Sequence, residues 1–292
     1  MTGKIIKGIA GFYYVHHGDD MVCQCRARGN FRNQKIKPLV GDNVEFTLLD
    51  EQEKEGNIEE ILPRKNALVR PAAANVDQAL VVFAITHPKP NLNLLDRFLV
   101  MMEVQEIPVS ICFNKTDLVT EEEMEHYRWV YETAGYHVLF SSARDQKGLE
   151  AIRRLLKGKT TILAGPSGVG KSSLTNAIYP QADMETGSIS KKIQRGKHTT
   201  RHTELFSIDK DTYLMDTPGF SSMYIEDLEE GDLKEYFPEF SRWEDQCRFL
   251  GCVHMGETVC GVKDAVSRGE IGESRYENYR LMYQELKDKR RY

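Results

Sequence analysis

The pattern G-x-x-x-x-G-K-S at residues 165–172 has the most specific chemistry in this chain. Glycines in such a loop let successive backbone N–H groups turn toward phosphate oxygens, because glycine adopts backbone angles that other residues avoid. Lys171 can place a cation on the outer phosphates of a nucleotide, and the Ser172 hydroxyl can reach a Mg²⁺ ion bound to them. An apolar run enters the loop and a helical stretch leaves it, which is the context that this motif requires. The residues expected to contact the phosphates are Gly165, Pro166, Ser167, Gly168, Val169, Gly170, Lys171, Ser172 and Ser173.

A second motif, NKTD, follows another apolar run and predicts which base is bound. The Asp117 carboxylate can accept hydrogen bonds from N1–H and the exocyclic amine of guanine together, a pattern that adenine does not offer. An adenine would leave that carboxylate buried and unpaired, so guanine is favoured and an ATPase is disfavoured. Asn114 is expected to tie this segment to the phosphate loop, and the Lys115 stem to lie on the face of the base. In the later segment SSA, Ser142 and Ala143 are expected to contact the nucleotide, with the Ala143 N–H directed at guanine O6.

The segment DTPG is typical of a switch that responds to the γ-phosphate. Its Asp216 can hold a water on Mg²⁺, and the Gly219 N–H can contact the γ-phosphate. Upstream lies RGKHTTRHT, where Thr200, in preference to Thr199, is expected to complete the Mg²⁺ shell in the triphosphate state. The expected magnesium ligands are therefore Ser172, Thr200 and Asp216. Directly after DTPG, where many GTPases place a water-orienting glutamine, this chain has Phe220, so unassisted turnover should be slow.

A parallel sheet is expected to position these motifs, because apolar runs alternate with helical stretches from about residue 70 onward. The predicted strands cover 79–85, 109–113, 137–141 and 161–164, and the predicted helices include 94–105 and 121–134. Such alternation favours right-handed crossovers and a sheet covered by helices on both faces. Two further strands, 204–209 and 212–215, are predicted to pair just before DTPG.

The first 64 residues or so have a different composition, with short β-branched and aromatic runs separated by turn signals. The segment HHGDD is typical of a hairpin turn, and Gly56-Asn57 predicts another turn. Several strands without a helix between them favour a small closed barrel, with an OB-like barrel as first choice and an SH3-like barrel as second. Cys23 and Cys25 lie two apart in a strand-like run, so they are expected to share a face and to pack in the core.

Four residues near the carboxyl end have the spacing of a metal site, C-x4-C-x-H-x5-C. They are Cys247, Cys252, His254 and Cys260. Three thiolates and one imidazole suit one tetrahedral Zn²⁺ per chain in a closed structural site, without an open position for catalysis. In a reduced compartment these cysteines favour zinc over a disulfide. Scattered buried cysteines are the alternative, and the spacing also resembles RNA-binding zinc knuckles.

Two stretches are basic without an intervening acidic residue, one in the predicted barrel and one at 191–201, around the first switch. A short charged run is usually a solvated face, but a barrel with basic loops is also a common platform for RNA. RNA bound to the second run could order the catalytic loop. In the barrel, RNA contacts are predicted at Arg26, Arg28, Arg32, Lys35 and Lys37.

The composition is that of a soluble globular protein, and 292 residues are enough for two or three domains. The net charge of −5 argues against a surface that coats nucleic acid along its whole extent. Every apolar stretch is shorter than the roughly 18 residues that a membrane span needs. A cytoplasmic protein without a membrane partner is therefore expected.

The order of the motifs is unusual, because both base-reading segments precede the phosphate loop and both switches follow it. In this order the chain resembles the circularly permuted GTPases, and specifically the small-ribosomal-subunit-dependent GTPase A family of bacteria. The resemblance covers essentially the whole chain and implies a multidomain α/β protein. Its parts would be an N-terminal OB-like β-barrel that binds RNA at 1–65, a circularly permuted P-loop GTPase domain at 66–228 and a C-terminal helical zinc-binding module at 229–292.

The resemblance also implies a role for His198 of the first switch, which would position the hydrolytic water. A neutral imidazole can accept a hydrogen bond from water near neutral pH, so the residue type suits the role. The alternatives are a solvated loop residue or an RNA contact. Because DTPG leads directly into the C-terminal module, loss of the γ-phosphate could move that module relative to the barrel.

The function implied by the resemblance is hydrolysis of GTP to GDP and phosphate, stimulated by the small ribosomal subunit during its late maturation. The monomeric protein would dock on the subunit and its rRNA with GTP and Mg²⁺ and be released on hydrolysis. One rival is a nucleotide-gated RNA-binding module with incidental turnover, with which Phe220 is compatible. Another is a sensor whose physiological ligands are guanosine polyphosphates, which competition binding would distinguish.

Overall fold

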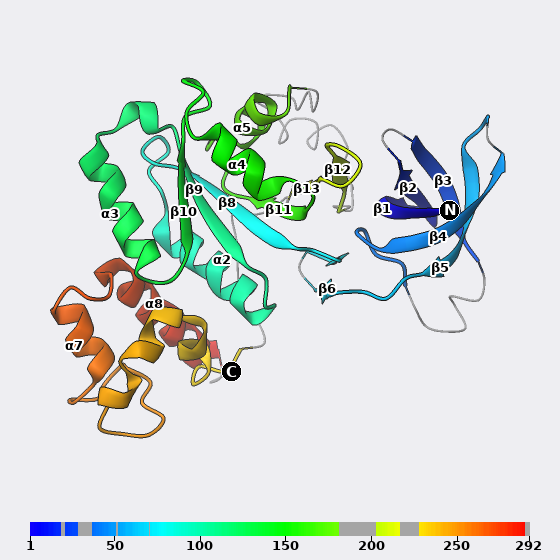
Figure 1. Ribbon diagram of the computed structural model, residues 1–292. Coiled ribbons are helices and arrows are strands. Elements are labelled where there is room, and N and C mark those ends of the chain that lie inside the picture. The colour runs from blue at the N-terminus through cyan, green and yellow to red at the C-terminus, as the bar shows by residue number, and fades with distance from the viewer. Residues whose placement is uncertain are drawn as a thin grey trace.

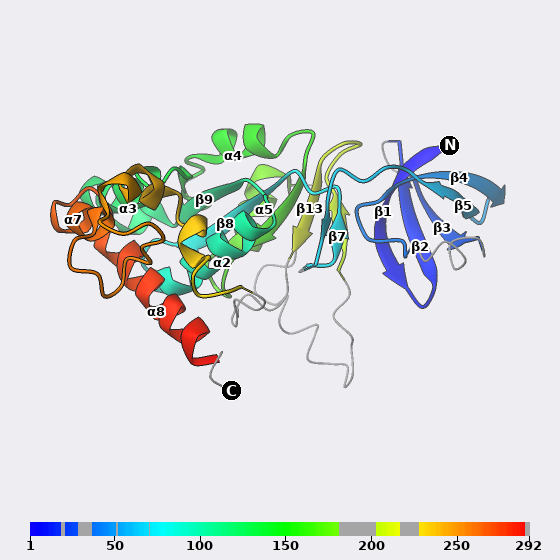
Figure 2. The same ribbon diagram turned by 90° about the horizontal axis from the view of Figure 1, so that it is seen from below.

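The computed structural model describes residues 1–18, 21–28, 37–50, 52–69, 71–180, 203–216 and 228–289. They form a β-barrel, a six-stranded sheet with helices on both faces, and a helical module, arranged in a row (Figure 1). The sheet lies in the middle, with the barrel and the helical module at opposite ends of the molecule (Figure 2). The predicted multidomain α/β architecture is confirmed, whereas the boundaries at 65 and 228 stay predictions.

The central sheet has the strand order β10-β9-β8-β11-β13-β12, and only β12 at its edge runs antiparallel to its neighbour. The strands are β8 (Gln78–Ala84), β9 (Val109–Asn114), β10 (His137–Ser141), β11 (Thr160–Ala164), β12 (Leu205–Ser207) and β13 (Tyr213–Asp216). Parallel strands end at the same edge of a sheet, so the segments that follow β9, β10 and β11 meet there, next to the end of β13. These segments are NKTD, SSA and the phosphate loop, and β13 ends at Asp216, the first residue of DTPG.

Helices cover both faces of this sheet. They are α2 (Leu92–Val104) and α3 (Glu121–Glu132) on one face, and α4 (Leu149–Leu156) and α5 (Lys171–Ile178) on the other. Val81 and Phe83 of β8 pack on the α2 side, while Leu80 and Val82 pack on the α4 side, so this strand is buried on both faces. That burial explains its continuous apolar run. The strands and helices predicted between 79 and 215 are all present, and their ends differ from the prediction by at most two residues.

The amino-terminal strands close into a barrel with the order β1-β2-β3-β5-β4. The strands are β1 (Thr2–Ile9), β2 (Phe12–His17), β3 (Met21–Ala27), β4 (Asn43–Asp50) and β5 (Glu55–Ile61). The first three form an antiparallel meander, and β3 then pairs with β5 in parallel. This is the expected OB-like arrangement. Cys23 and Cys25 are fully buried in its core, as expected.

The turn predicted at Gly56-Asn57 is wrong, because both residues lie inside β5. The chain turns at residues 52–54 instead. A Cβ atom at Gly56 would lie 2.6 Å from the carbonyl oxygen of Thr47 on β4. The glycine therefore serves the close approach of two strands rather than a change of chain direction.

The carboxyl-terminal module combines short 3₁₀ turns with two helices. The elements are η3 (Leu233–Tyr236), η4 (Pro238–Arg242), η5 (Glu244–Gln246), α7 (Gly261–Ser267) and α8 (Glu273–Lys289). Tyr279 and Met282 of α8 are fully buried against Phe237 and Phe240 of the 3₁₀ turns. Among the helices of the described ranges, none is both long enough and apolar enough to cross a membrane.

A buried ion network joins this module to the sheet domain. Arg275 of α8 is fully buried and donates to Asp96 of α2 at 2.8 Å and to Glu239 of η4 at 2.7 Å. Asp96 also accepts a hydrogen bond of 2.6 Å from Asn278, and the guanidinium lies 4.6 Å from the ring centre of Phe237. A buried charge requires such partners, so this network fixes how α8 lies on α2.

Candidate nucleotide site and metal centre

The phosphate loop connects β11 to α5 in a conformation that depends on its glycines. Gly165, Gly168 and Gly170 all have positive φ angles, +146°, +79° and +94°. A Cβ atom on Gly165 would lie 2.1 Å from the carbonyl oxygen of Val82 on the neighbouring strand. Lys171 begins α5, and its ammonium group donates to the Gly165 carbonyl at 2.6 Å. The loop thus places the amino terminus of a helix and a cation together, an arrangement that binds anions.

Asn114 and Lys115 connect the base-reading segment to the phosphate loop. Asn114 Nδ2 donates to the carbonyl oxygen of Val169 at 3.0 Å, which is the tie expected from the sequence. Lys115 Nζ donates to the carbonyl oxygens of Gly168 at 2.7 Å and His87 at 2.5 Å. Lys115 has a left-handed backbone (φ 68°), which directs its side chain back over the loop. The two segments therefore form one site, although the residues in contact are 55 and 53 positions apart in the chain.

The carboxylate expected to read guanine is held in place by its neighbours. Ser142 Oγ donates to Asp117 Oδ1 at 2.7 Å, and the Asp145 N–H donates to Ser142 Oγ at 3.0 Å. Arg144 lies 3.8 Å from the second carboxylate oxygen of Asp117. Ser142 therefore orients the carboxylate, a role different from the nucleotide contact expected of it. Its role as a nucleotide ligand stays a prediction.

Ser141 also belongs to this site, although no motif argument had selected it. Its hydroxyl donates to Asn114 Oδ1 at 3.2 Å, and the Ala143 N–H lies 3.4 Å from the same oxygen. Both the oxygen and the nitrogen of the Asn114 side-chain amide are thus engaged within the site. The first serine of SSA was a usable signal, because a small hydroxyl directly after a strand often bonds to a neighbouring loop.

Alanine at Gly170 should weaken nucleotide binding more than alanine at Gly168. Both positions have positive φ, so both variants carry similar backbone strain. At Gly170, however, the new Cβ would lie 2.6 Å from Asn114 Nδ2, whereas at Gly168 it would meet nothing within 4 Å. We expect Gly170→Ala to bind GDP at least about tenfold more weakly than Gly168→Ala. Titration with a fluorescent GDP analogue measures this, and equal losses would contradict the assigned role of Asn114.

The magnesium ligands and switches are placed only in part. Ser172 lies in the first turn of α5. Asp216 is the last residue of β13, the strand next to β11, and it pairs with Leu163 of β11. Ser173 follows in the same turn of α5. The backbone thus brings Ser172 and Asp216 to one edge of the sheet. His198, Thr199, Thr200 and Gly219 lie outside the described residues.

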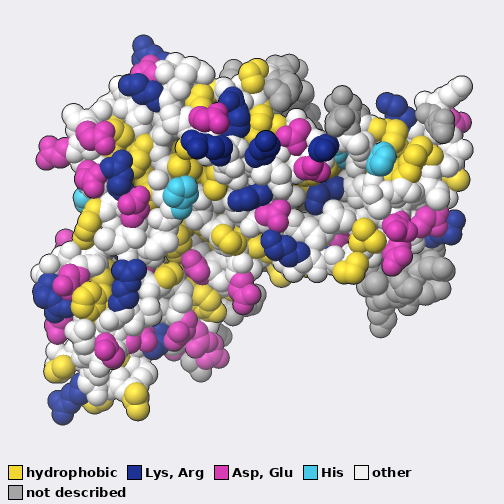
Figure 3. All heavy atoms as spheres, viewed as in Figure 1, with side chains coloured by type: hydrophobic (Ala, Val, Ile, Leu, Met, Phe, Trp, Pro, Cys, Tyr) yellow, Lys and Arg dark blue, Asp and Glu magenta, His cyan; other side chains and the backbone are white. Residues whose placement is uncertain are grey.

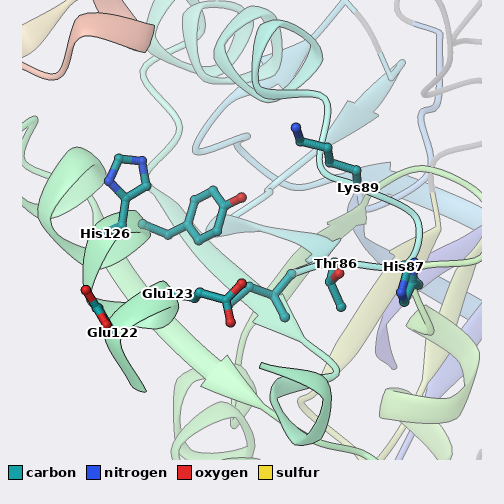
Figure 4. A pocket seen from close by; sticks show the side chains of 8 residues that line it. Thr86, His87, Lys89, Glu122, Glu123 and His126 are labelled. Carbon is teal, nitrogen blue, oxygen red and sulfur yellow. The ribbon is translucent and has the colours of Figure 1, made fainter. Parts of the chain in front are cut away.

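A pocket of about 540 Å³ lies beside this site, between the segment after β8 and helix α3 (Figure 4). Thr86, His87 and Lys89 line one side, and Glu122, Glu123 and His126 come from α3 on the other. No sequence motif indicated it. Its lining mixes a cation with carboxylates, which defines no single class of ligand.

The four predicted zinc ligands converge in the C-terminal module. The ligand atoms of Cys247, Cys252, His254 and Cys260 all lie within 4.8 Å of one another. His254 Nδ1 lies 3.3 Å from Cys260 Sγ and 3.7 Å from Cys247 Sγ, and these sulfur atoms are 3.9 Å apart. These are the spacings of adjacent corners of a tetrahedron with Zn–S near about 2.3 Å and Zn–N near about 2.0 Å. The donor set therefore fits a structural Zn²⁺.

Electrostatics around the cluster also favour a bound cation. Burial raises the pKa of the Cys252 and Cys260 thiols, so the thiolates that bind metal need a positive charge beside them. Burial lowers the pKa of His254, which keeps its imidazole neutral and able to coordinate. His254 Nε2 lies 3.2 Å from Glu244 Oε1, so this carboxylate fixes the tautomer that leaves Nδ1 free for the metal.

Further polar contacts support the loop that carries the ligands. Tyr276 donates to the His254 carbonyl and Tyr279 to the Val253 carbonyl, each at 2.6 Å. Glu257 accepts from the N–H groups of Val253 at 2.8 Å and Met255 at 2.7 Å. Sequence reasoning missed these carboxylate and tyrosine contacts. Acidic residues within a few positions of the ligands were the available signal for Glu244 and Glu257.

Removal of the metal should unfold the C-terminal module, because the metal site is central to its small core. We expect one zinc per purified chain, and chelation should remove the hydrogen-exchange protection of α8. In Cys260→Ala the zinc content should fall to near zero, whereas Cys23→Ala, a buried cysteine of the barrel, should keep one zinc. Elemental analysis and hydrogen-exchange mass spectrometry test this. A stoichiometric zinc content in Cys260→Ala would rule out the assigned ligand set.

The predicted RNA-contact residues of the barrel have varied surroundings. Arg26 lies over the Phe12 ring at 4.8 Å, and Arg28 forms an ion pair of 2.6 Å with Glu59. Lys37 is exposed, whereas Arg32 and Lys35 lie outside the described residues. On the face shown in Figure 3, Lys and Arg side chains gather over the central sheet domain near α4, interspersed with Asp and Glu. RNA binding by the barrel stays a prediction.

Family models match most of the chain. The model described as RsgA GTPase matches residues 61–226, and the model described as RsgA N-terminal domain matches residues 2–58. A protein named "Small ribosomal subunit biogenesis GTPase RsgA" from Agathobacter rectalis is 54% identical, with 100% of each chain covered. The protein of the same name from Alkaliphilus metalliredigens is 51% identical, with 99% of each chain covered.

Solved structures agree with these matches. The structure titled "The crystal structure of YloQ, a circularly permuted GTPase" superposes with a TM-score of 0.77 at 42% identity, covering 99% of this chain and 95% of that one. The crystal structure of YjeQ from Thermotoga maritima gives a TM-score of 0.79 at 39% identity, covering 98% of each chain. The permuted order of motifs inferred from the sequence is therefore that of a known GTPase fold. On the strength of the matched motifs, sheet order and relatives, the chain belongs to the RsgA GTPase family.

Proposed function

We propose that this chain hydrolyses GTP to GDP and phosphate, and that the small ribosomal subunit stimulates the reaction during its late maturation. One observation supports this reaction more strongly than the other observations do. The guanine-reading segment is hydrogen-bonded to the phosphate loop through Asn114 and Lys115, so base and phosphates are recognised by one connected site. The partner is proposed because the relatives carry the name small ribosomal subunit biogenesis GTPase.

The proposed division of work within the site follows from residue chemistry. Asp117 accepts from the base, the loop N–H groups and Lys171 hold the phosphates, and Ser172, Thr200 and Asp216 hold Mg²⁺. A Mg²⁺ ion held by these residues would supply positive charge to neutralise the phosphates. The Gly219 N–H contacts the γ-phosphate, and His198 positions the attacking water. Zinc has a structural role in the C-terminal module.

The proposed domains are an RNA-binding barrel at 1–65, the GTPase domain at 66–228 and the zinc module at 229–292. In this proposal the GTP-bound monomer docks on rRNA of the subunit, and hydrolysis releases it in the cytoplasm. The first test is GTP turnover with and without purified small ribosomal subunits, with excess ATP as competitor. Strong stimulation that ATP leaves unchanged supports both guanine selectivity and the partner, whereas slow turnover that subunits do not change argues against the partner.

Alanine at His198 should abolish the stimulated turnover and leave GTP binding intact. The imidazole is the group proposed to orient the water, because Phe220 cannot form a hydrogen bond at the usual glutamine position. Loss of a positioned base costs about 100-fold or more in rate. The matched control is His202→Ala, four residues along the same segment, which should keep the stimulated rate. Loss of GTP affinity in His198→Ala, with turnover per bound GTP unchanged, would count against this role.

A second candidate function is favoured by Phe220, which predicts slow intrinsic turnover. The chain would then be an RNA-binding module whose affinity depends on the bound nucleotide. Stimulation of at least tens-fold by the subunit would exclude it. Guanosine polyphosphates fit the same base-reading segment, and competition against GTP would measure whether they are physiological ligands.

A further inference from the structure

Strand β1 of the barrel also contacts the central sheet domain. The register between β1 and β2 shifts between Ile5 and Lys7, so this strand contains a bulge. Ile5 is fully buried in the barrel core, whereas Ile6 packs against the core of the sheet domain on the side of α2 and α3. A bulge turns a side chain away from the regular alternation, and here it directs neighbouring residues into two different cores.

The residue after the bulge contacts the edge strand of the sheet. Lys7 forms an antiparallel β-bridge with Glu204, and its ammonium group lies 2.8 Å from the Glu204 carboxylate. Glu204 directly precedes β12, in which Leu205 pairs with Met215 of β13. One isolated bridge and one ion pair therefore join the barrel to this end of the β12–β13 hairpin.

A second contact lies at the other end of the same hairpin. His16 of β2 is only 3% exposed, and its Nδ1 lies 2.9 Å from the Tyr213 hydroxyl. The same hydroxyl donates to the Lys210 carbonyl at 2.9 Å. His16 Nε2 lies 3.1 Å from Ser207 Oγ. Both ring nitrogens of a barrel histidine are thus engaged by the two strands of the hairpin.

The position of this hairpin gives these contacts a functional meaning. Its first strand, β12, begins just after the segment that contains Thr200, and its second strand, β13, ends at Asp216 of DTPG. Both predicted switches are therefore covalently attached to the hairpin that the barrel contacts. A shift of the barrel cannot leave both contacts intact unless the hairpin moves with it.

We propose that His16 and Lys7 of the barrel are positioning residues for GTP hydrolysis, because they hold the hairpin from which both switches extend. This inference rests on the proposed GTPase function. Neither residue touches the nucleotide, and each acts through the strand that it contacts. A partner that binds the barrel changes the geometry of the switches by this route, and the nucleotide changes the position of the barrel by the same route.

A charge exchange across the Lys7–Glu204 pair tests the proposal in the free protein. Lys7→Glu and Glu204→Lys should each lower kcat for GTP about fivefold, with KM changed less than about twofold, because the nucleotide ligands remain in place. The exchange variant that carries both substitutions should regain at least half of the wild-type kcat. His16→Phe, which keeps a ring but removes both nitrogens, should lower kcat more than either single reversal. The matched control is Arg280→Glu, which breaks an exposed ion pair on α8.

Binding measurements keep the proposal testable if hydrolysis itself is not observed. The ratio of affinities for a non-hydrolysable GTP analogue and GDP should shift about fivefold in the single reversals and return in the exchange variant. If the wild-type protein does not hydrolyse GTP, the proposed function fails. The affinity ratio still shows whether the barrel contacts are coupled to the nucleotide site. An unchanged kcat and an unchanged ratio overturn the inference. The inference is also overturned if kcat falls in step with the melting temperature in every variant and does not recover in the exchange variant. That result would identify a purely structural contact.

Discussion

Replacing Asp117 by asparagine should weaken GTP binding by at least about 100-fold and should allow xanthosine triphosphate to bind in its place. The carboxylate offers two acceptors to N1–H and the exocyclic amine of guanine. Asparagine offers one acceptor and one donor, which match N1–H and the C2 carbonyl of xanthine. Ser142 can still donate to Oδ1 of the asparagine, so the side chain should keep its orientation.

Competition titrations with GTP, xanthosine triphosphate and ATP measure this change of specificity. The control is Asp145→Asn, because Asp145 contacts Ser142 only through its backbone N–H in this network. That variant should bind GTP like the wild type. If Asp117→Asn kept full GTP affinity, the base would be read by other groups, and the assignment of this segment would be wrong.

Replacing Arg275 by methionine should destabilise the protein by about 3–5 kcal/mol, the largest effect on stability that we expect from one substitution. Arg275 is fully buried between Asp96 and Glu239. Burial already raises the pKa of Asp96 despite the opposing charge of Arg275. Without the guanidinium, two buried carboxylates would face each other with only Asn278 to compensate Asp96.

Urea unfolding of the zinc-loaded protein measures the change in the free energy of unfolding. Arg280→Met is the matched control on the same helix, because Arg280 forms an exposed pair with Glu277 and should change stability by less than about 1 kcal/mol. Adding Asp96→Asn and Glu239→Gln to Arg275→Met should recover much of the loss, since the uncompensated charges are then removed. Equal, small effects of both arginine substitutions would contradict the importance of burial here.

The strands, helices and motif positions of the central domain were predictable from the sequence because they depend on local information. A buried parallel strand produces a continuous apolar run, and the loops that bind nucleotide have fixed spacings. The clustering of the three cysteines and the histidine of the predicted metal site was predictable for the same reason. In contrast, Gly56 was misread, because a glycine needed for close strand approach has the same local appearance as a glycine in a turn.

Most of the features that sequence reasoning missed depend on residues that are distant in the chain. Arg275 appears as an ordinary surface charge on a helix, and only its partners, 179 and 36 residues away, show that it is buried. The hydroxyl of Ser142 was expected at the nucleotide, yet it contacts Asp117, 25 residues earlier. Tertiary packing determines such contacts, and the local periodicity of the sequence does not predict them.

The buried ion network between α8 and α2 influences which domains can move relative to one another. Separating α8 from α2 would expose a charge network to water or leave it unpaired. The barrel instead contacts the hairpin through His16, through the bridge and half-exposed ion pair of Lys7 with Glu204, and through Lys4 over the Tyr213 ring. We therefore expect the carboxyl-terminal module and the sheet to move as one unit, and the barrel to move relative to them. When γ-phosphate is lost, rotation should therefore take place at β1, and the zinc module should travel with the guanine site.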